Sequence, residues 1–435
     1  MASPETSLLP IDIIEEIFCR IPIEYLTQFK LTYCKQWHAL LKDKRFIYKY
    51  LDLVQERFIR IDHTVQIINP LQGARSSSPI PEEFHNISEI STTVHCDGLL
   101  VCRCNETRTR RCKLAVWNPF LKHIKWIKPL GFYSVNDFYG IGYNNVSRDE
   151  YKILRIFEGE LEDDEIAVIG PCEPVIQIYD FKTNAWRIIV DVATLDWSID
   201  PPCKGVSIKG NMYWVAHWNK KPELFILCFD FSTETFKVVC NVPFQCSVLD
   251  TASLSSFRGD RLSLLHQREE TTKIEVWVTN TLNGDDVVSW EKYLNVTNPD
   301  LPTLHTDHDL AHPSYFVDKN DSIIVWCEEV MEDEAADDYV CVSVYEISKY
   351  GTAKKVVETG RCNLGNYDRS FVCGHVYLPS LVPAFGLPIR INVAQKEHEP
   401  RTGSCLPVNS KHNLSFLRER GRNDRDSLCN DKVKT

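Results

Sequence analysis

Apolar residues at helical spacing mark the first fifty residues of the chain. Asp12 stands where an N-cap is expected, Glu15 three residues later completes a capping-box variant, and Pro22 ends the predicted helix. Apolar side chains between these signals recur at the three- and four-residue intervals of one helix face. This predicted stripe consists of Ile13, Ile14, Ile17, Phe18 and Ile21.

Two further short helices are predicted before residue 51. The second covers residues 25–30, and the third carries Trp37, Leu40 and Leu41, followed by Phe46 and Tyr50. Three short helices bury too little surface to be stable alone, and the first stripe is wider than a small bundle needs. We therefore expect this segment to bind a partner protein. The alternative is a helical hairpin that only caps the following domain.

From about Val94 onward, short strand-like runs separated by turns replace the helical spacing. Residues 178–188 repeat the pattern of residues 228–238 at an offset of 50: Asp-Phe after a strand, a polar turn, then an aromatic and a basic residue. Turns that precede an apolar strand interleave with this unit. Two hairpins recurring every ~50 residues predict four-stranded blades, about five or six in number. A large irregular β-sandwich is the alternative.

These patterns divide the chain into four parts and predict an α+β multidomain protein. Residues 4–50 form the three-helix segment, and residues 51–93, with a polar run of Ser and Pro, form a connector. Residues 94–383 form an all-β, propeller-like domain. Residues 384–435 are polar and aperiodic, so we expect them to be disordered.

The net charge of −11 argues against binding to nucleic acid or to an anionic membrane, since both require clustered Lys and Arg. No run of 18 apolar residues and no export signal is visible. The 17 cysteines are odd in number and scattered, which favours reduced, buried thiols. We therefore expect a location in the cytoplasm, the nucleus or both.

Candidate chemistry is sparse. His305, His308 and His312 have metal-binding side chains, but flanking prolines indicate a loop rather than an aligned helix face. The cluster Cys96, Cys102, Cys104 and Cys112 lacks paired C-x2-C knuckles, so buried strand thiols are the simpler interpretation. Two acidic runs, at 158–165 and 328–338, lack the spacing of an EF-hand. We therefore predict no catalytic site, no metal and no cofactor.

The helical segment resembles an F-box. The order Leu-Pro-x-Asp-Ile-x-x-Glu-Ile-Phe-x-Arg-Ile-Pro, followed by Cys-Lys-x-Trp and Leu-Leu, is similar to that family, with one apparent extra residue near Tyr33. In the family these helices bind a Skp-type adaptor, which joins a cullin and its RING partner. The resemblance assigns the adaptor surface to Leu9, Pro10, Ile13, Ile17, Phe18, Ile21, Pro22, Leu26, Cys34 and Trp37.

The β-rich body resembles the F-box-associated domain of the large plant F-box family. The resemblance rests on the order of several short motifs between about residues 94 and 380. These are Cys96-Asp-Gly-Leu-Leu, Trp117-Asn-Pro, Phe138-Tyr-Gly-Ile-Gly-Tyr143, Asp149-x-Tyr151-Lys152, Tyr179-Asp-Phe and the closing Val376-Tyr-Leu-Pro-Ser-Leu-Val-Pro383.

Together the two resemblances imply a substrate-recognition subunit of a Skp-cullin-F-box ubiquitin ligase. Such a subunit is not an enzyme; its β-domain would bind a protein substrate whose identity the sequence does not reveal. The alternative is a carbohydrate- or small-molecule-binding β-propeller protein that acts outside a ligase, because the many aromatic residues permit such a site.

Overall fold

The computed structural model describes the chain from Leu9 to Ala384 with internal gaps. The gaps are residues 30–33, 62–63, 107–111, 131–132, 134–136, 158–174, 190–194, 200–203, 246, 248–249, 270, 283–286, 305–312, 332–338 and 364–371. The predicted disordered tail, the residue at position 33, the histidines at 305–312 and most of both acidic runs lie outside the described residues. No described helix is long and apolar enough to cross a membrane.

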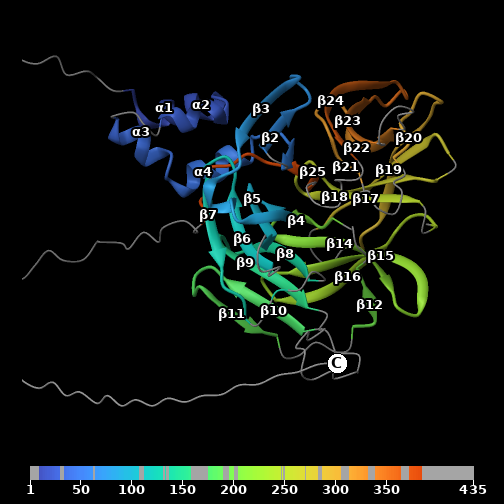
Figure 1. Ribbon diagram of the computed structural model, residues 1–435, viewed down its shortest axis with the longest axis horizontal. Coiled ribbons are helices and arrows are strands. Elements are labelled where there is room, and N and C mark those ends of the chain that lie inside the picture. Colours follow the sequence, from blue (N-terminus) through green and yellow to red (C-terminus); the bar gives the residue numbers. More distant parts are fainter. Residues whose placement is uncertain are drawn as a thin grey trace, which may run out of the picture. The chain divides into compact units, whose positions relative to one another are not determined.

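The described N-terminal segment contains four short helices, one more than the sequence indicated (Figure 1). They are α1 (Ile11–Arg20), α2 (Ile23–Phe29), α3 (Lys35–Leu40) and α4 (Lys44–Leu51). The additional helix forms because Asp43 caps it, its side chain accepting a hydrogen bond from Arg45 N at 2.9 Å. Phe46 and Tyr50 therefore lie on a helix of their own, with both rings buried.

The N-cap prediction at Asp12 is wrong. Pro10 is the N-cap of α1, and its carbonyl accepts hydrogen bonds from Ile13 N and Ile14 N. Proline donates no N–H and so loses nothing at this position. Asp12 lies instead in the first turn, where a negative charge favours the positive end of the helix dipole.

The remainder of the described chain is all β and forms six sheets, which we call blades 1 to 6. Blade 1 contains β4 (Ile87–Cys96), β5 (Leu99–Glu106), β6 (Cys112–Asn118) and β7 (His123–Ile127). Blade 2 contains β8 (Phe138–Asn144), β9 (Ser147–Phe157), β10 (Val175–Asp180) and β11 (Ala185–Ile188). Blade 3 contains β12 (Trp197–Ser198), β13 (Val206–Ile208), β14 (Asn211–Trp218), β15 (Lys221–Asp230) and β16 (Thr235–Asn241).

The last three blades complete the propeller. Blade 4 contains β17 (Thr251–Phe257), β18 (Arg261–Gln267), β19 (Lys273–Thr279) and β20 (Trp290–Thr297). Blade 5 contains β21 (Ser314–Val317), β22 (Ile323–Met331), β23 (Tyr339–Ile347) and β24 (Ala353–Asn363). Blade 6 combines β25 (Val372–Tyr377) with β1 (Arg57–Ile61), β2 (Thr64–Asn69) and β3 (Ala74–Pro79). The predicted all-β body is thus confirmed as a six-bladed propeller.

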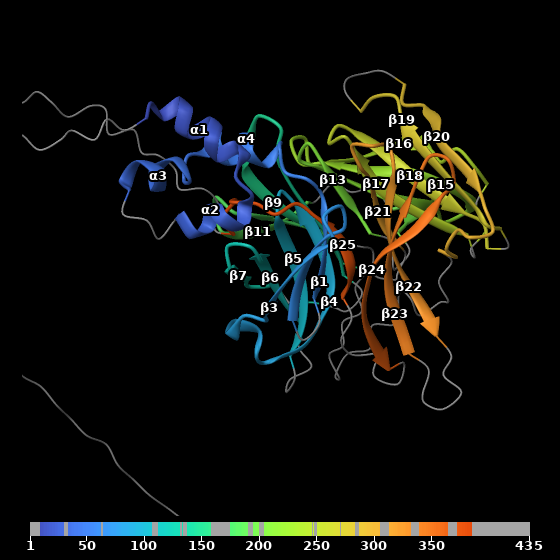
Figure 2. The ribbon, with the colours of Figure 1, turned by 90° about the horizontal axis from the view of Figure 1, so that it is seen from above.

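Blade 6 closes the propeller because it takes strands from both ends of the described chain. Figure 2 shows the orange-red β25 beside the blue β1, and the register pairs Phe58 with Val376. The inner strands of neighbouring blades contact one another in turn, including β21 with β25 and β25 with β4. The sequence interpretation placed a connector at residues 51–93, whereas β1 to β3 and the short helix η1 (Glu82–Phe84) lie there.

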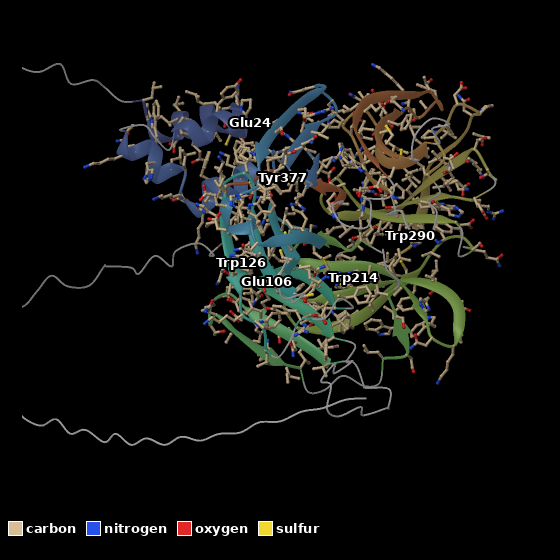
Figure 3. All side chains as sticks on the ribbon, viewed as in Figure 1. Glu24, Glu106, Trp126, Trp214, Trp290 and Tyr377 are labelled. Carbon is tan, nitrogen blue, oxygen red and sulfur yellow. The ribbon has the colours of Figure 1, made fainter. Side chains whose placement is uncertain are left out.

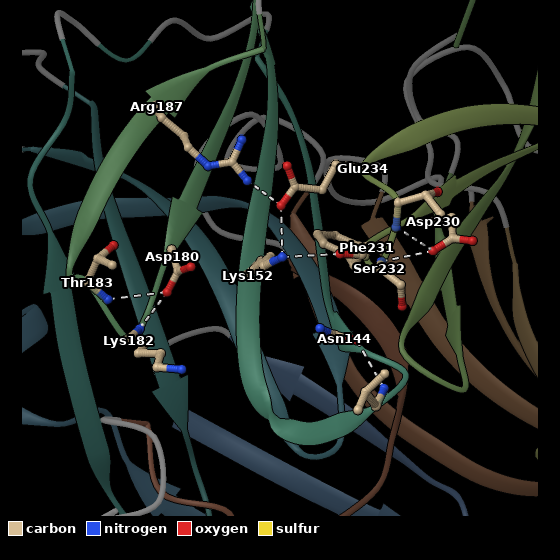
Figure 4. Close-up of polar contacts among 12 residues, drawn as sticks. Asn144, Lys152, Asp180, Lys182, Thr183, Arg187, Asp230, Phe231, Ser232 and Glu234 are labelled. Atoms are coloured by element: carbon tan, nitrogen blue, oxygen red, sulfur yellow. Dashed lines mark hydrogen bonds and ion pairs between the residues drawn. The ribbon is translucent and has the colours of Figure 1, made fainter.

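The turn between the last two strands of blades 2 and 3 has the same polar cap (Figure 4). Asp180 Oδ1 accepts from the backbone N–H groups of Lys182 and Thr183, and Asp230 Oδ1 accepts from those of Ser232 and Thr233. This shared geometry explains why residues 178–188 and 228–238 have the same sequence pattern at an offset of 50.

Side-chain contacts also join neighbouring blades outside their inner strands. Glu234 of blade 3 accepts a hydrogen bond from Lys152 Nζ at 2.8 Å and forms an ion pair with Arg187. Both of these partners belong to blade 2. The indole Nε1 of Trp290 in blade 4, labelled in Figure 3, donates to Asn241 O of blade 3 at 2.9 Å.

Candidate functional site

Helix α1 has two apolar faces, and only one of them is covered. Ile14 and Phe18 are 4% and 3% exposed and form part of the core, whereas Ile13 and Ile17 are 49% and 44% exposed. Each pair is spaced four residues apart, so each forms its own stripe along the helix. Exposed isoleucines at adjacent turns are unfavourable in water, and exposed apolar patches are typical of surfaces that bind other proteins.

Three more exposed apolar side chains belong to the same helical segment. Leu9 and Tyr25 are each 56% exposed, and Ile11 is 49% exposed. The sequence interpretation included Leu9 but missed Ile11 and Tyr25. Helical spacing places apolar residues on one buried stripe. An apolar residue outside that stripe is therefore a candidate for an exposed binding surface, and this signal could have revealed Ile11 and Tyr25. We call Leu9, Ile11, Ile13, Ile17 and Tyr25 the exposed apolar set.

The other residues assigned to the adaptor surface lie deeper. Phe18 and Leu26 are buried, and the Phe18 ring meets the Trp37 ring edge-on at 5.5 Å. Ile21, Cys34 and Trp37 are half-buried, while Pro10 and Pro22 are exposed. Phe18 and Trp37 therefore join α1 to α3, and the assignment of these residues to an adaptor surface stays a prediction.

Arg148, at the start of β9, links the helical segment to two blades. Its guanidinium donates to both oxygens of Asp97 at 3.0 and 3.1 Å and to Asp52 Oδ1 at 2.8 Å. It also lies over the Tyr48 ring, 4.8 Å from the ring centre, and Tyr48 donates its hydroxyl to Arg148 O. The Tyr151 hydroxyl also donates a hydrogen bond to Asp97, so this carboxylate accepts hydrogen bonds from two side chains. Arg148 thus couples α4 to the propeller.

The segment after β25 lies against the motif residues of blade 1. Asn118 Nδ2 donates to Ser380 O and to Val382 O at 3.1 and 2.7 Å, and Ser380 is fully buried. Gly98, at a positive φ of 80°, has no room for a Cβ, which would lie 2.3 Å from Ser380 Oγ. His95 Nε2 accepts from the backbone N–H groups of Gly98 and Leu378.

Four of the six motifs that carry the family resemblance therefore meet where blade 1 contacts the closing segment of the propeller. Cys96-Asp-Gly, Trp117-Asn-Pro, the Tyr151 segment and the closing segment come together at one place, although they are distant in sequence. They hold the scaffold and do not identify a surface for a substrate.

The described residues offer no metal centre. None of their His, Cys, Asp and Glu side chains form a group of three or more that could hold an ion. Cys102 and Cys104 are buried in β5, and burial raises the pKa of both thiols. Buried thiols with raised pKa values are poor nucleophiles and poor metal ligands.

Two family matches cover most of the chain. Residues 6–49 match the F-box domain, and residues 50–384 match the F-box associated beta propeller domain. A short helical F-box joined to a β-propeller defines a class of two-domain proteins. The chain belongs to the F-box proteins that carry an F-box associated β-propeller domain.

Relatives from Arabidopsis thaliana support this assignment. F-box protein At3g22650 is 71% identical over 385 residues, which cover 88% of this chain and 99% of the relative. F-box/WD-40 repeat-containing protein 1 is 47% identical over 384 residues, covering 88% and 90% of the two chains. Among solved structures, TolB from Acinetobacter baumannii is 12% identical, covers 80% of this chain and 72% of that one, and has a TM-score of 0.38.

Proposed function

We propose that this protein is a substrate-recognition subunit of a Skp-cullin-F-box ubiquitin ligase. The F-box would bind a Skp-type adaptor, which joins it to a cullin and a RING subunit, and the propeller would bind a protein substrate. The observation that carries the proposal is the exposed apolar set on an F-box whose opposite face is already packed. The protein itself would be non-catalytic and would act in the cytoplasm, the nucleus or both.

The coupling of the two domains supports this role. Ubiquitin transfer by such a complex depends on holding the substrate near the conjugating enzyme, so a fixed geometry raises the effective concentration of substrate lysines. Arg148, Asp97 and Asp52 join α4 to blades 1 and 2 with hydrogen bonds of 2.8 to 3.1 Å. A receptor with a flexible connection between its two domains would lose much of this increase in effective concentration.

Binding to a purified Skp-type adaptor tests the docking half of the proposal. We expect the double substitution Ile13→Arg and Ile17→Arg to weaken binding at least about tenfold, because two charged groups would have to enter an apolar interface. Both side chains are exposed in the free protein, so the fold is expected to survive. The matched control is Ile188→Arg, at a 50% exposed isoleucine on the outer strand of blade 2.

Surface plasmon resonance with the full-length chain gives the affinities, and circular dichroism verifies folding. Failure of the wild-type chain to bind any adaptor would contradict the ligase proposal. Equal weakening of adaptor binding by the α1 variant and by the control would show that the α1 face is not the docking surface. The substrate half is tested by proximity labelling in cells. Proteins labelled by the wild-type chain should accumulate when Ile13 and Ile17 are both replaced by Arg, because binding continues while ubiquitin transfer stops.

A further inference from the structure

A cavity of about 100 Å³ lies among the inner strands of five blades. Residues of β4, β13, β17, β21 and β25 line it, together with Glu56 from the segment that precedes β1. A pocket at the centre of a propeller is surrounded by the scaffold, so that any group placed there meets side chains from several blades. The closure residues described above form one of its walls.

Lys204 is the only cation among the described residues that line this cavity; His95 and His375 line it too, and burial lowers the pKa of both imidazoles, so they are neutral. Lys204 Nζ donates to Ser314 Oγ at 2.9 Å, and His375 lies close enough that Lys204 and His95 both contribute to lowering its pKa, after burial. No hydrogen bond joins the His375 imidazole to any residue that the structure describes. His95 is held as the neutral tautomer with its proton on Nδ1, because Nε2 accepts from two backbone N–H groups.

Acceptor oxygens gather on the side formed by blade 4. Ser253 Oγ donates to Pro313 O and Ser255 Oγ donates to Tyr315 O, each at 2.6 Å, so these hydroxyls have only lone pairs left. Glu56 accepts from Ser256 Oγ, also at 2.6 Å. Burial raises the pKa of Glu56 to about 7, so this carboxyl is partly protonated near neutral pH. The cavity lining therefore combines one cation, Lys204, with neutral imidazoles and acceptor oxygens. The Asp97 carboxylate also lines the cavity, but it is already paired with Arg148 and Tyr151.

We propose that this cavity binds a small oxyanion that carries a hydroxyl group, such as hydrogen phosphate or a short hydroxycarboxylate. The negative oxygens face Lys204 and His375, and the hydroxyl group donates to the serine oxygens or to Glu56. The size agrees with this class, because a 150 Å³ cavity holds a benzene ring and the cavity seen here is smaller. The site is independent of the proposed ligase role.

Inorganic phosphate and sulfate form a matched pair of probes for the full-length chain. Both are tetrahedral oxyanions, but at pH 7 only phosphate carries a hydroxyl group. We expect a saturable rise of the melting temperature and a calorimetric binding signal with phosphate, at least about tenfold stronger than with sulfate at equal ionic strength. Glycolate, run in parallel, distinguishes a carboxylate ligand from a phosphate ligand.

Variants assign the signal to the cavity. Lys204→Met is expected to weaken phosphate binding at least about tenfold, while the control Lys220→Met, at an exposed turn of the same blade, leaves it unchanged. If Lys204→Met does not fold, His375→Gln replaces it, since that imidazole makes no described hydrogen bond. Equal, non-saturable stabilisation by phosphate and sulfate in all variants would reflect general salt exclusion and would overturn the proposal. Equal saturable binding of sulfate would overturn the ligand class.

Discussion

Asn118 shows how much one side chain can hold together in this propeller. Its Nδ2 group donates to Ser380 O and Val382 O, while its Oδ1 accepts from the backbone N–H groups of Phe120 and Leu121 at 3.0 Å. The side chain is fully buried. It therefore shapes the turn after β6 and, at the same time, fixes the segment that follows β25.

Asn118→Ala is predicted to lower the free energy of unfolding by about 3 kcal/mol, because four hydrogen bonds would be lost, two of them to buried carbonyls. Urea denaturation followed by tryptophan fluorescence measures the loss. The control is Asn145→Ala, at an exposed asparagine, which should change stability by less than about 0.5 kcal/mol. A loss below about 1 kcal/mol at Asn118 would mean that water replaces these hydrogen bonds easily.

Glycines show what the sequence could and could not indicate at the scale of a residue. The run Phe138-Tyr-Gly-Ile-Gly-Tyr143 was recognisable as a family motif, but its physical reason is a contact with another blade. A Cβ on Gly142 would lie 2.0 Å from Gly210 O, and Tyr143 N donates to that same carbonyl. The partner lies in the next blade, so that no local pattern in the sequence could identify it.

At the scale of the element, local patterns predicted the strands that repeat and failed for those that do not. The repeat at an offset of 50 correctly indicated two hairpins, β10–β11 and β15–β16, and each has an Asp cap in its turn. By contrast, β3 has the sequence Ala-Arg-Ser-Ser-Ser-Pro, whose composition is typical of a loop. It is the outermost strand of blade 6, where one edge faces solvent and apolar side chains are not required.

The candidate docking surface was predictable in part for a related reason. Helical periodicity finds the apolar positions of α1 but does not tell which of two apolar stripes is covered. The structure shows that Phe18 packs on Trp37 inside the helical segment while Ile13 and Ile17 remain exposed. Only the three-dimensional arrangement of α1, α3 and α4 decides this, and it depends on contacts between helices rather than on spacing within one helix.

Arg148→Met is predicted to loosen α4 from the propeller and to lower the free energy of unfolding by about 3 kcal/mol. The Asp97 carboxylate, 11% exposed, would lose two of its hydrogen bonds and keep only that from Tyr151. Hydrogen exchange of the α4 amides should become faster, because Tyr48 loses the guanidinium that covers its ring.

Asp52→Asn is the matched comparison, since this second partner of Arg148 is 64% exposed and its ion pair is screened by water. It should change stability by less than about 1 kcal/mol and leave exchange in α4 nearly as slow as in the wild type. Unchanged exchange in α4 with Met at position 148 would show that the helical segment is held by its apolar contacts alone.

At the scale of the whole molecule, closure depends on β25, the last strand among the residues that the structure describes. β25 pairs with β1 and contacts β4 and β21, so that it completes blade 6 and joins blades 5 and 1. The residues after it are buried as well: Ser380, Leu381, Val382 and Ala384 are at most 3% exposed. No pattern within blade 6 could reveal this pairing, because its strands come from opposite ends of the described chain.

Two truncations separate closure from simple chain length. A chain ending at residue 388 keeps β25 and the buried closing segment, and it should melt within about 2 °C of the full-length protein. A chain ending at residue 371 lacks both. Its β1 would present an unpaired edge, and Phe58 would lose its cover against Val376, so we expect aggregation in size-exclusion chromatography.

A synthetic peptide of residues 372–384, added during refolding of the shorter chain, should restore a monomer by inserting as the missing strand, because strand addition satisfies the free edge of β1. The same peptide with Val376→Pro is the control. Val376 lies opposite Phe58 within the strand pairing, and proline both removes an N–H group and disfavours the extended ladder. A shorter chain that is monomeric and melts like the full-length protein without any peptide would show that the other five blades hold the propeller closed by themselves.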